Sequence, residues 1–213
     1  MQIRTALNFF LTPLLAAGLL AAASNAAAAG NPEAGKAQAI VCAACHGQDG
    51  ATGIDPTYPN LAGQNEAYLF NQLRMIQNGE RQVLLMAGQL TGKTEENLRD
   101  LAAYYASLPG KLGEAGSNDD SIELAEGIYR GGIIGKGVAA CSACHSPNGQ
   151  GNAPAGFPVL SGQPKEYTIA QLTAYREGER KSDESFGGMM RGVAGGLTDK
   201  EIAALADYLQ GLH

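Results

Sequence analysis

The short stretches VCAACHGQDG (41–50) and ACSACHSPNG (140–149) decide how the rest of this chain is interpreted. In each, two cysteines are separated by two residues, and a histidine follows the second cysteine at once. The chain has only four cysteines and three histidines, so these stretches hold every cysteine and all but one of the histidines. The chemistry of the protein is therefore expected to lie there.

The spacing Cys-x-x-Cys-His is typical of the covalent attachment of a c-type haem. On a helix, Cys42 and Cys45 share one face, so their thiols can bond the two vinyl groups of one haem. His46 can then reach the iron from the proximal side. The second stretch repeats this arrangement. It predicts two haems held by six residues: Cys42, Cys45, His46, Cys141, Cys144 and His145.

The first 29 residues differ in composition from the rest of the chain. Arg4 is their only charged residue, an apolar run covers 6–23, and the small-residue stretch SNAAAAG (24–30) follows. This order is typical of a secretory signal peptide. We predict a signal peptide at 1–29, cleaved near Ala27 to Ala29, and a periplasmic location. An uncleaved anchor is the alternative, and no later stretch is long and apolar enough to cross a bilayer.

The chain also contains an internal repeat. YPNLAGQNEAYLFNQLRMIQNGER (58–81) aligns with FPVLSGQPKEYTIAQLTAYREGER (157–180) at an offset of 99 residues, which also joins the two haem motifs. Further on the offset is 104, and TEENLRDLAAYYASL (94–108) aligns with TDKEIAALADYLQGL (198–212). The second half therefore has five extra residues between these blocks. The repeat indicates a tandem duplication of one small domain.

The predicted fold is all-α. Each unit is expected to have a short helix before the haem motif, a middle helix over 66–78 or 165–177, and a last helix with apolar residues at helical spacing. Thr94 and Thr198 are predicted N-caps of the last helices. No strand pattern competes with these helices.

The predicted order of domains follows from the repeat. The first haem domain covers 30–109, a linker rich in Gly, Ser and Asp covers 110–120, and the second haem domain covers 121–213. Domains of this size have modest cores, and a covalently held haem would supply each with an apolar centre.

The ligand on the distal side of each iron decides what the haem can do. Two bis-histidine haems would need four histidines, and His213 at the chain end is the only one outside the motifs. Methionine is the natural substitute, because a thioether ligates haem iron and raises its potential. Met86 and Met190 match at the offset of 104. We predict that they are the axial ligands.

Two other methionines compete for these roles. Met75 lies inside a middle helix and aligns with Ala174, which favours a core position. Met189 is one residue out of register with Met86. The sequence therefore predicts that Met190, and not Met189, ligates the second iron.

On these residues the sequence resembles the dihaem cytochromes of the cytochrome c4 family, in which two class I cytochrome c domains are fused in tandem. The resemblance covers the chain after the signal peptide: the CAACH and CSACH motifs, the matched methionines, the YPNLAGQ (58–64) and FPVLSGQ (157–163) loops and the final ADYLQGL (206–212) helix. It implies a periplasmic electron carrier, not an enzyme, that works between a quinol-oxidising cytochrome bc1-type complex and a terminal oxidase or other acceptor.

The resemblance also implies supporting contacts. The carbonyls of Pro59 and Pro158 would receive the N–H groups of the proximal histidines and fix each imidazole. Tyr104 and Tyr208 would help to pack the last helix of each domain against the first. The lengthened stretch KSDESFGGM (181–189) departs from the family pattern.

The charge of the chain limits its partners. The formal net charge is −6, and the halves that follow the signal peptide carry −2 and −5 when divided at Gly113. Haem propionates would add negative charge, which disfavours nucleic acid and allows at most peripheral association with a membrane. The expected partners are redox proteins, and the unequal charges suggest ends that meet different partners.

Three alternatives to a carrier remain. The first is a dihaem subunit of a larger redox enzyme, such as flavocytochrome c sulfide dehydrogenase. The second is a dihaem peroxidase, which needs one iron open to peroxide and hence one methionine ligand missing. The third is a non-haem module in which the same cysteines and histidines bind zinc or form disulfides. Six ligands on each iron would favour the carrier, because no site for a substrate remains.

Overall fold

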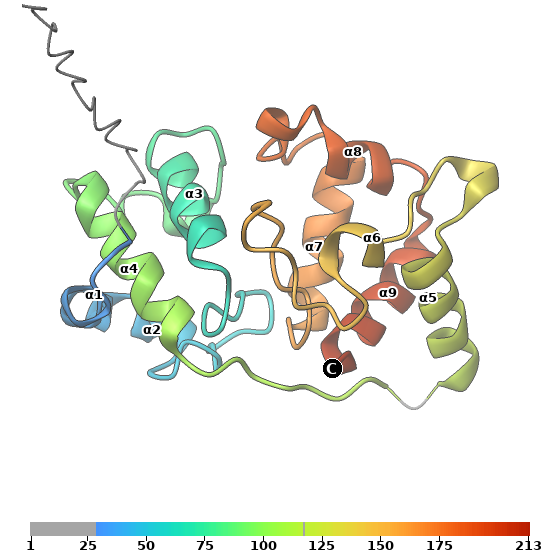
Figure 1. The fold of residues 1–213 in the computed structure, drawn as a ribbon, viewed down its shortest axis with the longest axis horizontal. Helices are drawn as coiled ribbons and strands as arrows, with labels where there is room; N and C mark the ends of the chain where they lie inside the picture. The colour runs from blue at the N-terminus through green and yellow to red at the C-terminus, as the bar shows by residue number, and fades with distance from the viewer. Residues whose placement is uncertain (1–28, 117) are drawn as a thin grey trace, which may run out of the picture.

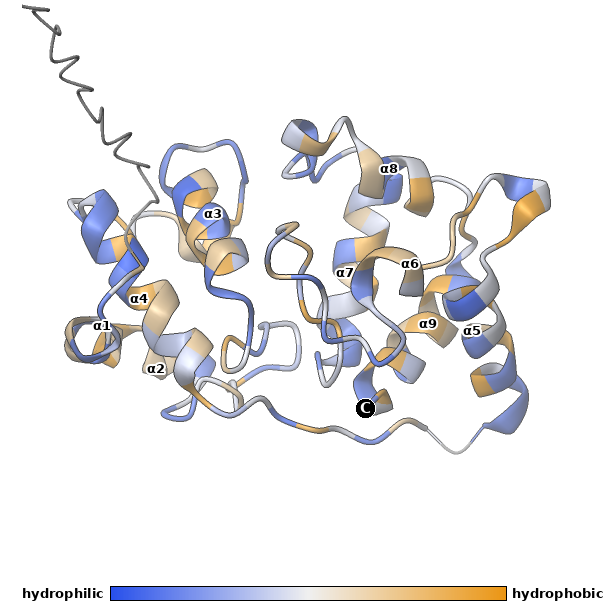
Figure 2. Ribbon diagram, viewed as in Figure 1, coloured by the Kyte–Doolittle hydropathy of each residue, from blue (hydrophilic) through white to orange (hydrophobic). Residues whose placement is uncertain are grey.

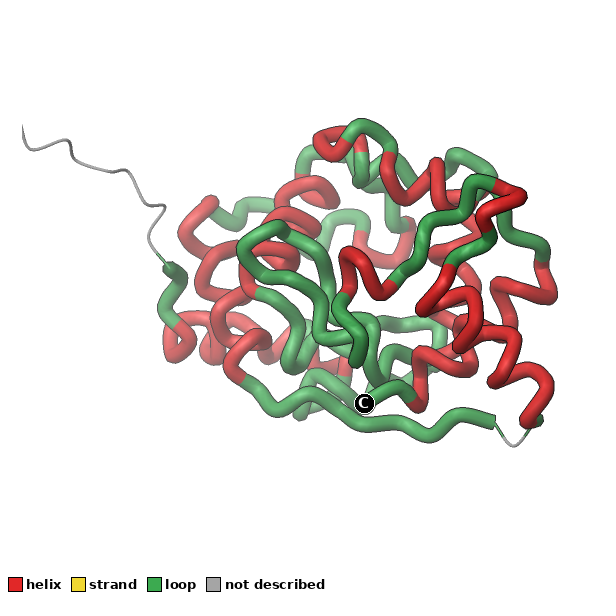
Figure 3. Tube along the Cα trace, turned by 45° about the vertical axis from the view of Figure 1, so that its right-hand side comes forward, coloured by secondary structure: helices red, strands yellow, loops and turns green. Residues whose placement is uncertain are grey.

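The computed structural model describes residues 29–116 and 118–213. Within these ranges the regular structure consists of nine α-helices and four 3-10 turns, with isolated β-bridges but no strand (Figure 3). The all-α prediction is therefore confirmed. In the same ranges no helix has the length and apolar character to cross a membrane. The predicted signal peptide lies outside the described residues, apart from Ala29.

Two groups of helices lie side by side, joined by an extended segment (Figure 1). The first group has α1 (Pro32–Gln38), α2 (Ala43–His46), α3 (Glu66–Gln77) and α4 (Glu95–Ser107). The second has α5 (Asp119–Gly131), α6 (Ser142–His145), α7 (Lys165–Arg176), α8 (Met189–Ala194) and α9 (Asp199–Gly211). The 3-10 turns are Ala39–Val41, Leu84–Met86, Ile134–Lys136 and Glu184–Phe186. Helix α8 has no counterpart in the first group and follows the lengthened stretch.

Both last helices begin at the threonines that the sequence indicates. The Oγ1 atom of Thr94 accepts the N–H of Asn97 at 3.2 Å, and the Asn97 side chain accepts the N–H of Thr94 at 3.0 Å. Thr198 and Glu201 make the same reciprocal contact at the start of α9. These capping boxes satisfy N–H groups that the first turn of a helix leaves free.

Each domain has its own hydrophobic core. In the first, α4 packs against α1 and α3 around Leu69, Leu101 and Tyr105. In the second, α9 packs against α5 and α7 around Tyr129 and Leu205. Both groups of helices have hydrophobic and hydrophilic segments (Figure 2). Burying one large apolar side chain stabilises the folded state by about 1.5–3 kcal/mol. Because the two clusters share no residue, each core stabilises its own domain.

The first and last helices of each domain meet at a close crossing. A Cβ atom added at Gly35 in α1 would lie 1.9 Å from the carbonyl oxygen of Asp100 and 2.8 Å from the Cβ of Tyr104. At the matching crossing, the rings of Tyr129 in α5 and Tyr208 in α9 lie 5.6 Å apart. Tyr104 and Tyr208 therefore lie where the last helix meets the first, as the family resemblance implied.

The segment between α4 and α5 is fastened to the second domain. The N–H of Gly116 donates to Oδ2 of Asp207 at 3.0 Å, and Nε2 of Gln210 donates to the carbonyl of Glu114 at 2.9 Å. The side chains of Asp207 and Gln210 both belong to α9. This segment contains most of the predicted linker (110–120), and α5 begins within its last residues.

Candidate haem sites

Both Cys-x-x-Cys-His motifs face one continuous cavity of about 1290 Å³. Its volume exceeds the roughly 300–1,000 Å³ of an ordinary small-molecule pocket. The structure brings all eight predicted site residues to its wall: Cys42, Cys45, His46, Met86, Cys141, Cys144, His145 and Met190. Residues that lie 99 positions apart in the sequence thus share one space.

Each motif folds into a single helical turn. The N–H of His46 donates to the carbonyl of Cys42 at 2.9 Å, and the N–H of His145 donates to the carbonyl of Cys141 at 2.9 Å. This turn places both thiols of a motif on the cavity side. All four cysteines are free of disulfides, as thioether bonds to a haem require.

The two imidazoles are buried and held in one orientation. Nδ1 of His46 lies 3.1 Å from the carbonyl oxygen of Pro59, and Nδ1 of His145 lies 2.9 Å from that of Pro158. The contacts expected from the resemblance are therefore confirmed. Because a carbonyl only accepts, Nδ1 carries the proton and Nε2 keeps its lone pair for a metal.

Burial also sets the protonation state of these histidines. It lowers the pKa of His46 and His145, against the smaller opposing effect of the proline carbonyls. A lowered pKa keeps the imidazole neutral at physiological pH, and the neutral ring is the form that ligates iron. The histidine environment therefore fits a haem iron.

The methionines reach the cavity from different local structures. Met86 ends a 3-10 turn, whereas Met190 lies in the first turn of α8. Both side chains are half-buried on the cavity wall. Met189 is 42% exposed and Met75 is 9% exposed, and both of these side chains also lie on the cavity wall.

The side chains around the cavity suit a haem in chemical terms. They offer paired thiols, a neutral imidazole and a largely apolar wall, which are what covalent attachment, proximal ligation and a flat hydrophobic ring need. Within the described ranges, no cluster of three or more His, Cys, Asp or Glu side chains is arranged to hold a bare metal ion.

The wall between the two motifs includes contacts that sequence reasoning did not find. Gln64 hydrogen-bonds the backbone of Val159, and Gln163 hydrogen-bonds the backbone of Asn60. The offset of 99 relates Gln64 to Gln163 and Asn60 to Val159. The identity of the glutamines in the repeat was a signal, but it did not show that each one contacts the backbone of the other domain.

Comparisons with known proteins agree with this geometry. The family described as "Cytochrome c" matches residues 134–213, and "Cytochrome C oxidase, cbb3-type, subunit III" matches residues 28–104. Cytochrome c4 of Pseudomonas aeruginosa is 47% identical over 186 residues, which cover 87% of this chain and 90% of that protein. A "Thiosulfate dehydrogenase electron acceptor" of Thiomonas intermedia is 34% identical, covering 81% of this chain and 78% of its own.

A solved structure shows the same arrangement of two domains. Reduced recombinant cytochrome c4 from Pseudomonas stutzeri superposes with a TM-score of 0.82 at 44% identity, covering 87% of this chain and 100% of that one. Two cytochrome c domains with two Cys-x-x-Cys-His haem sites, a wholly helical fold and this similarity along most of the chain all agree. The chain belongs to the cytochrome c4 family and is an electron-transfer protein with two c-type haems, not an enzyme.

Proposed function

We propose that this chain carries electrons in the periplasm from a quinol-oxidising complex of the cytochrome bc1 type to a terminal oxidase. The observation that supports this most directly is the single cavity of about 1290 Å³ that both haem motifs line. An electron received at one haem would have a short path to the other. The protein could then meet its donor at one domain and its acceptor at the other.

We further propose Met86 and Met190 as the distal ligands. When bound, each haem supplies one-electron chemistry at its iron. The chain would hold each iron with a buried neutral imidazole and a thioether. A closed iron has no position for oxygen, peroxide or a substrate, and little needs to rearrange when its charge changes.

The periplasmic location belongs to the same proposal. It rests on the composition of the signal peptide proposed at 1–29 and on the chemistry of covalent haem attachment. The domain boundaries proposed with it are 30–109 and 121–213, joined by the linker 110–120.

The first experiment is an absorption spectrum of the holoprotein, oxidised, reduced, and reduced under carbon monoxide. The expected result is two haems per chain, a ferric thioether band, and no change with carbon monoxide. A carbon monoxide shift in about half of the haem would mean one open iron. The peroxidase alternative would then replace the carrier.

The donor is tested by reduction kinetics. Quinol with bc1-containing membranes should reduce both haems rapidly, and oxidase-containing membranes should reoxidise them. A soluble dehydrogenase as donor is the second candidate, because the chain is 34% identical to a "Thiosulfate dehydrogenase electron acceptor". Reduction by thiosulfate with its dehydrogenase, but not by quinol, would favour that candidate. Stable co-purification with a flavoprotein would favour a sulfide dehydrogenase subunit.

A further inference from the structure

The domain interface contains two arginines whose charges lack an acidic partner. Arg81 and Arg180 are equivalent at the offset of 99 residues. Arg180 is only 7% exposed, and Arg81 is half-buried. In the part of the chain that the structure describes, neither guanidinium forms a salt bridge. Buried charges are normally paired, so these two positions call for an anion.

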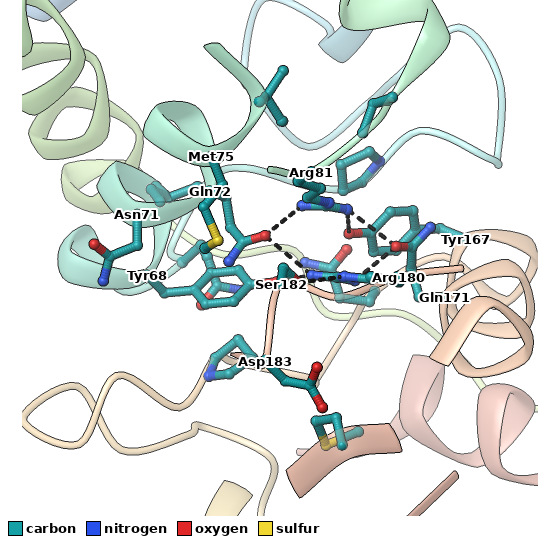
Figure 4. Close-up of a pocket in the computed structure, with 18 of the residues that line it drawn as sticks. Tyr68, Asn71, Gln72, Met75, Arg81, Tyr167, Gln171, Arg180, Ser182 and Asp183 are labelled. Carbon is teal, nitrogen blue, oxygen red and sulfur yellow. Dashed lines mark hydrogen bonds between the residues drawn. The ribbon is translucent and has the colours of Figure 1, made fainter. Parts of the chain in front are cut away.

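Two shared amide oxygens hold the guanidiniums close to one another (Figure 4). Oε1 of Gln72 accepts from Nη1 of Arg81 at 2.8 Å and from Nη2 of Arg180 at 3.2 Å. Oε1 of Gln171 accepts from Nη1 of Arg180 at 2.7 Å and from Nη2 of Arg81 at 3.0 Å. Each arginine thus contacts side chains of both domains. Like charges held this close raise each other's cost of burial.

The other hydrogen-bond partners of the two guanidiniums are neutral hydroxyls, and Arg180 also lies over the ring of Tyr175. Nη2 of Arg81 donates to Oη of Tyr167 at 3.3 Å. Arg180 donates from Nη2 to Oη of Tyr68 at 2.9 Å and from Nε to Oγ of Ser182 at 2.8 Å. Burial raises the pKa of Tyr167, but the charges of Arg81 and Arg180 and the hydrogen bonds from both arginines together lower it by more, so its pKa falls below the usual value. The local field favours negative charge.

This cluster belongs to the wall of the haem cavity. Tyr68, Gln72, Arg81, Tyr167, Gln171, Arg180 and Ser182 all line the same continuous space as the two Cys-x-x-Cys-His motifs. A haem carries two propionate carboxylates, and a guanidinium N–H donates a charge-assisted hydrogen bond to a carboxylate oxygen. The two haems that the cavity receives would therefore supply the carboxylates that Arg81 and Arg180 lack.

We propose that Arg81 and Arg180 form one carboxylate site that binds a propionate of each haem. Two positive charges would then be balanced by two negative ones. Because each arginine contacts both domains, each would stabilise the reduced state of both haems, and the two redox centres would share one electrostatic environment. The proposal depends on the two haem sites, and it does not depend on the redox partners or on the methionine ligands.

The test measures both midpoint potentials of the holoprotein by spectroelectrochemical titration. Arg81→Gln and Arg180→Gln should each lower both potentials, because loss of a nearby positive charge favours the ferric haem. Arg81→Lys and Arg180→Lys keep the charge and should leave both potentials near those of the wild type. Arg130→Gln is the matched control, since Arg130 forms an exposed pair with Glu126 on α5; it should leave both potentials unchanged.

Three outcomes would overturn the proposal. Unchanged potentials in the Gln variants would show that the arginines do not act on the haems. A fall confined to the haem of the substituted domain would exclude a shared site. Equal falls in the Gln and Lys variants would assign the effect to packing.

A separate measurement on the wild type distinguishes propionates from an anion of the solution. Exchange of chloride for phosphate at constant ionic strength should leave both potentials in place. If the potentials follow the anion, a solution ion occupies the site and the assignment to propionates is wrong. This measurement decides the question even where a variant fails to fold.

Discussion

Gln64 and Gln163 make the same contact in opposite directions across the domain interface. Nε2 of Gln64 donates to the carbonyl of Val159 at 2.9 Å, and its Oε1 accepts the N–H of Val159 at 2.8 Å. Gln163 donates to the carbonyl of Asn60 at 2.8 Å and accepts its N–H at 3.1 Å. Each side chain thus replaces water at both backbone groups of one residue in the other domain. The two halves of the repeat therefore contact one another through two matching pairs of hydrogen bonds.

Removal of either glutamine should weaken this interface. Gln64→Ala leaves the backbone groups of Val159 without their partners, at an expected cost of about 1–3 kcal/mol in the free energy of unfolding. Gln163→Ala should have a similar cost at Asn60. Urea unfolding of the holoprotein measures both. Gln82→Ala is the control, because Gln82 is exposed and forms no hydrogen bond of its side chain in the described structure; a cost equal to that of the interface variants would contradict this reasoning.

The neighbouring methionines should behave differently when each is removed. Met190→Ala should abolish the ferric thioether band of one haem and allow carbon monoxide to bind its reduced iron. Met86→Ala should do the same at the other haem. Met189→Ala should keep both bands, because the Met189 side chain is 42% exposed. Loss of a band in the Met189 variant alone would reverse the proposed ligand assignment.

Two glycines in helices should respond in opposite ways to the same substitution. Gly35→Ala places a methyl group 1.9 Å from the carbonyl oxygen of Asp100, which forces α1 from α4 and should cost about 1–3 kcal/mol. Gly127→Ala in α5 meets nothing within 4 Å and should stabilise that helix by about 0.5–1 kcal/mol. Thermal unfolding measures both changes. A loss of stability at both positions would mean that the close crossing of α1 and α4 is not what destabilises the Gly35→Ala variant.

The ion pair between Glu201 and Lys136 should make a pH-dependent contribution to stability. The carboxylate lies 2.8 Å from Nζ of Lys136. Burial raises the pKa of Glu201, but Lys136 and the Thr198 cap lower it by more, so the net shift is downward from 4.5. A carboxyl with a lowered folded pKa stabilises the protein above its unfolded pKa, and this stabilisation is lost as the pH falls through the folded pKa.

Glu201→Gln should therefore reduce the free energy of unfolding at pH 7 by less than about 1 kcal/mol, since solvent partly screens the pair. The difference from the wild type should shrink as the pH falls below 4.5, the ordinary value for the group. Urea unfolding at a series of pH values measures this. A difference that stays constant with pH would assign the effect to the helix cap and not to the charge.

Local chemistry explains what could be predicted from the sequence. The Cys-x-x-Cys-His spacing, the capping threonines Thr94 and Thr198 and the apolar spacing of the last helices all act within a few residues. The predicted middle helix at 66–78 differs from α3 (Glu66–Gln77) by one residue. Because these patterns occur twice, the sequence predicted two domains and two haem sites.

Helix α8, which follows the insertion in the second domain, could not be predicted from the sequence. The five extra residues were visible, but the Gly-rich stretch before Met190 has little helical preference of its own. Helix α8 forms because it packs on α7 and because Arg191 pairs with the buried Asp183 at 2.8 Å. A short helix depends on tertiary contacts more than on propensity.

The sequence by itself determined the haem attachment residues, the helices common to both repeats and the duplication, because each follows from spacing along the chain. Only the tertiary structure decided that Gln64 meets Val159 and that Arg81 and Arg180 share two amide oxygens. Equivalent residues in a repeat need not lie near one another. Their contact depends on how two complete domains dock, and that depends on surfaces assembled from many distant parts of the chain.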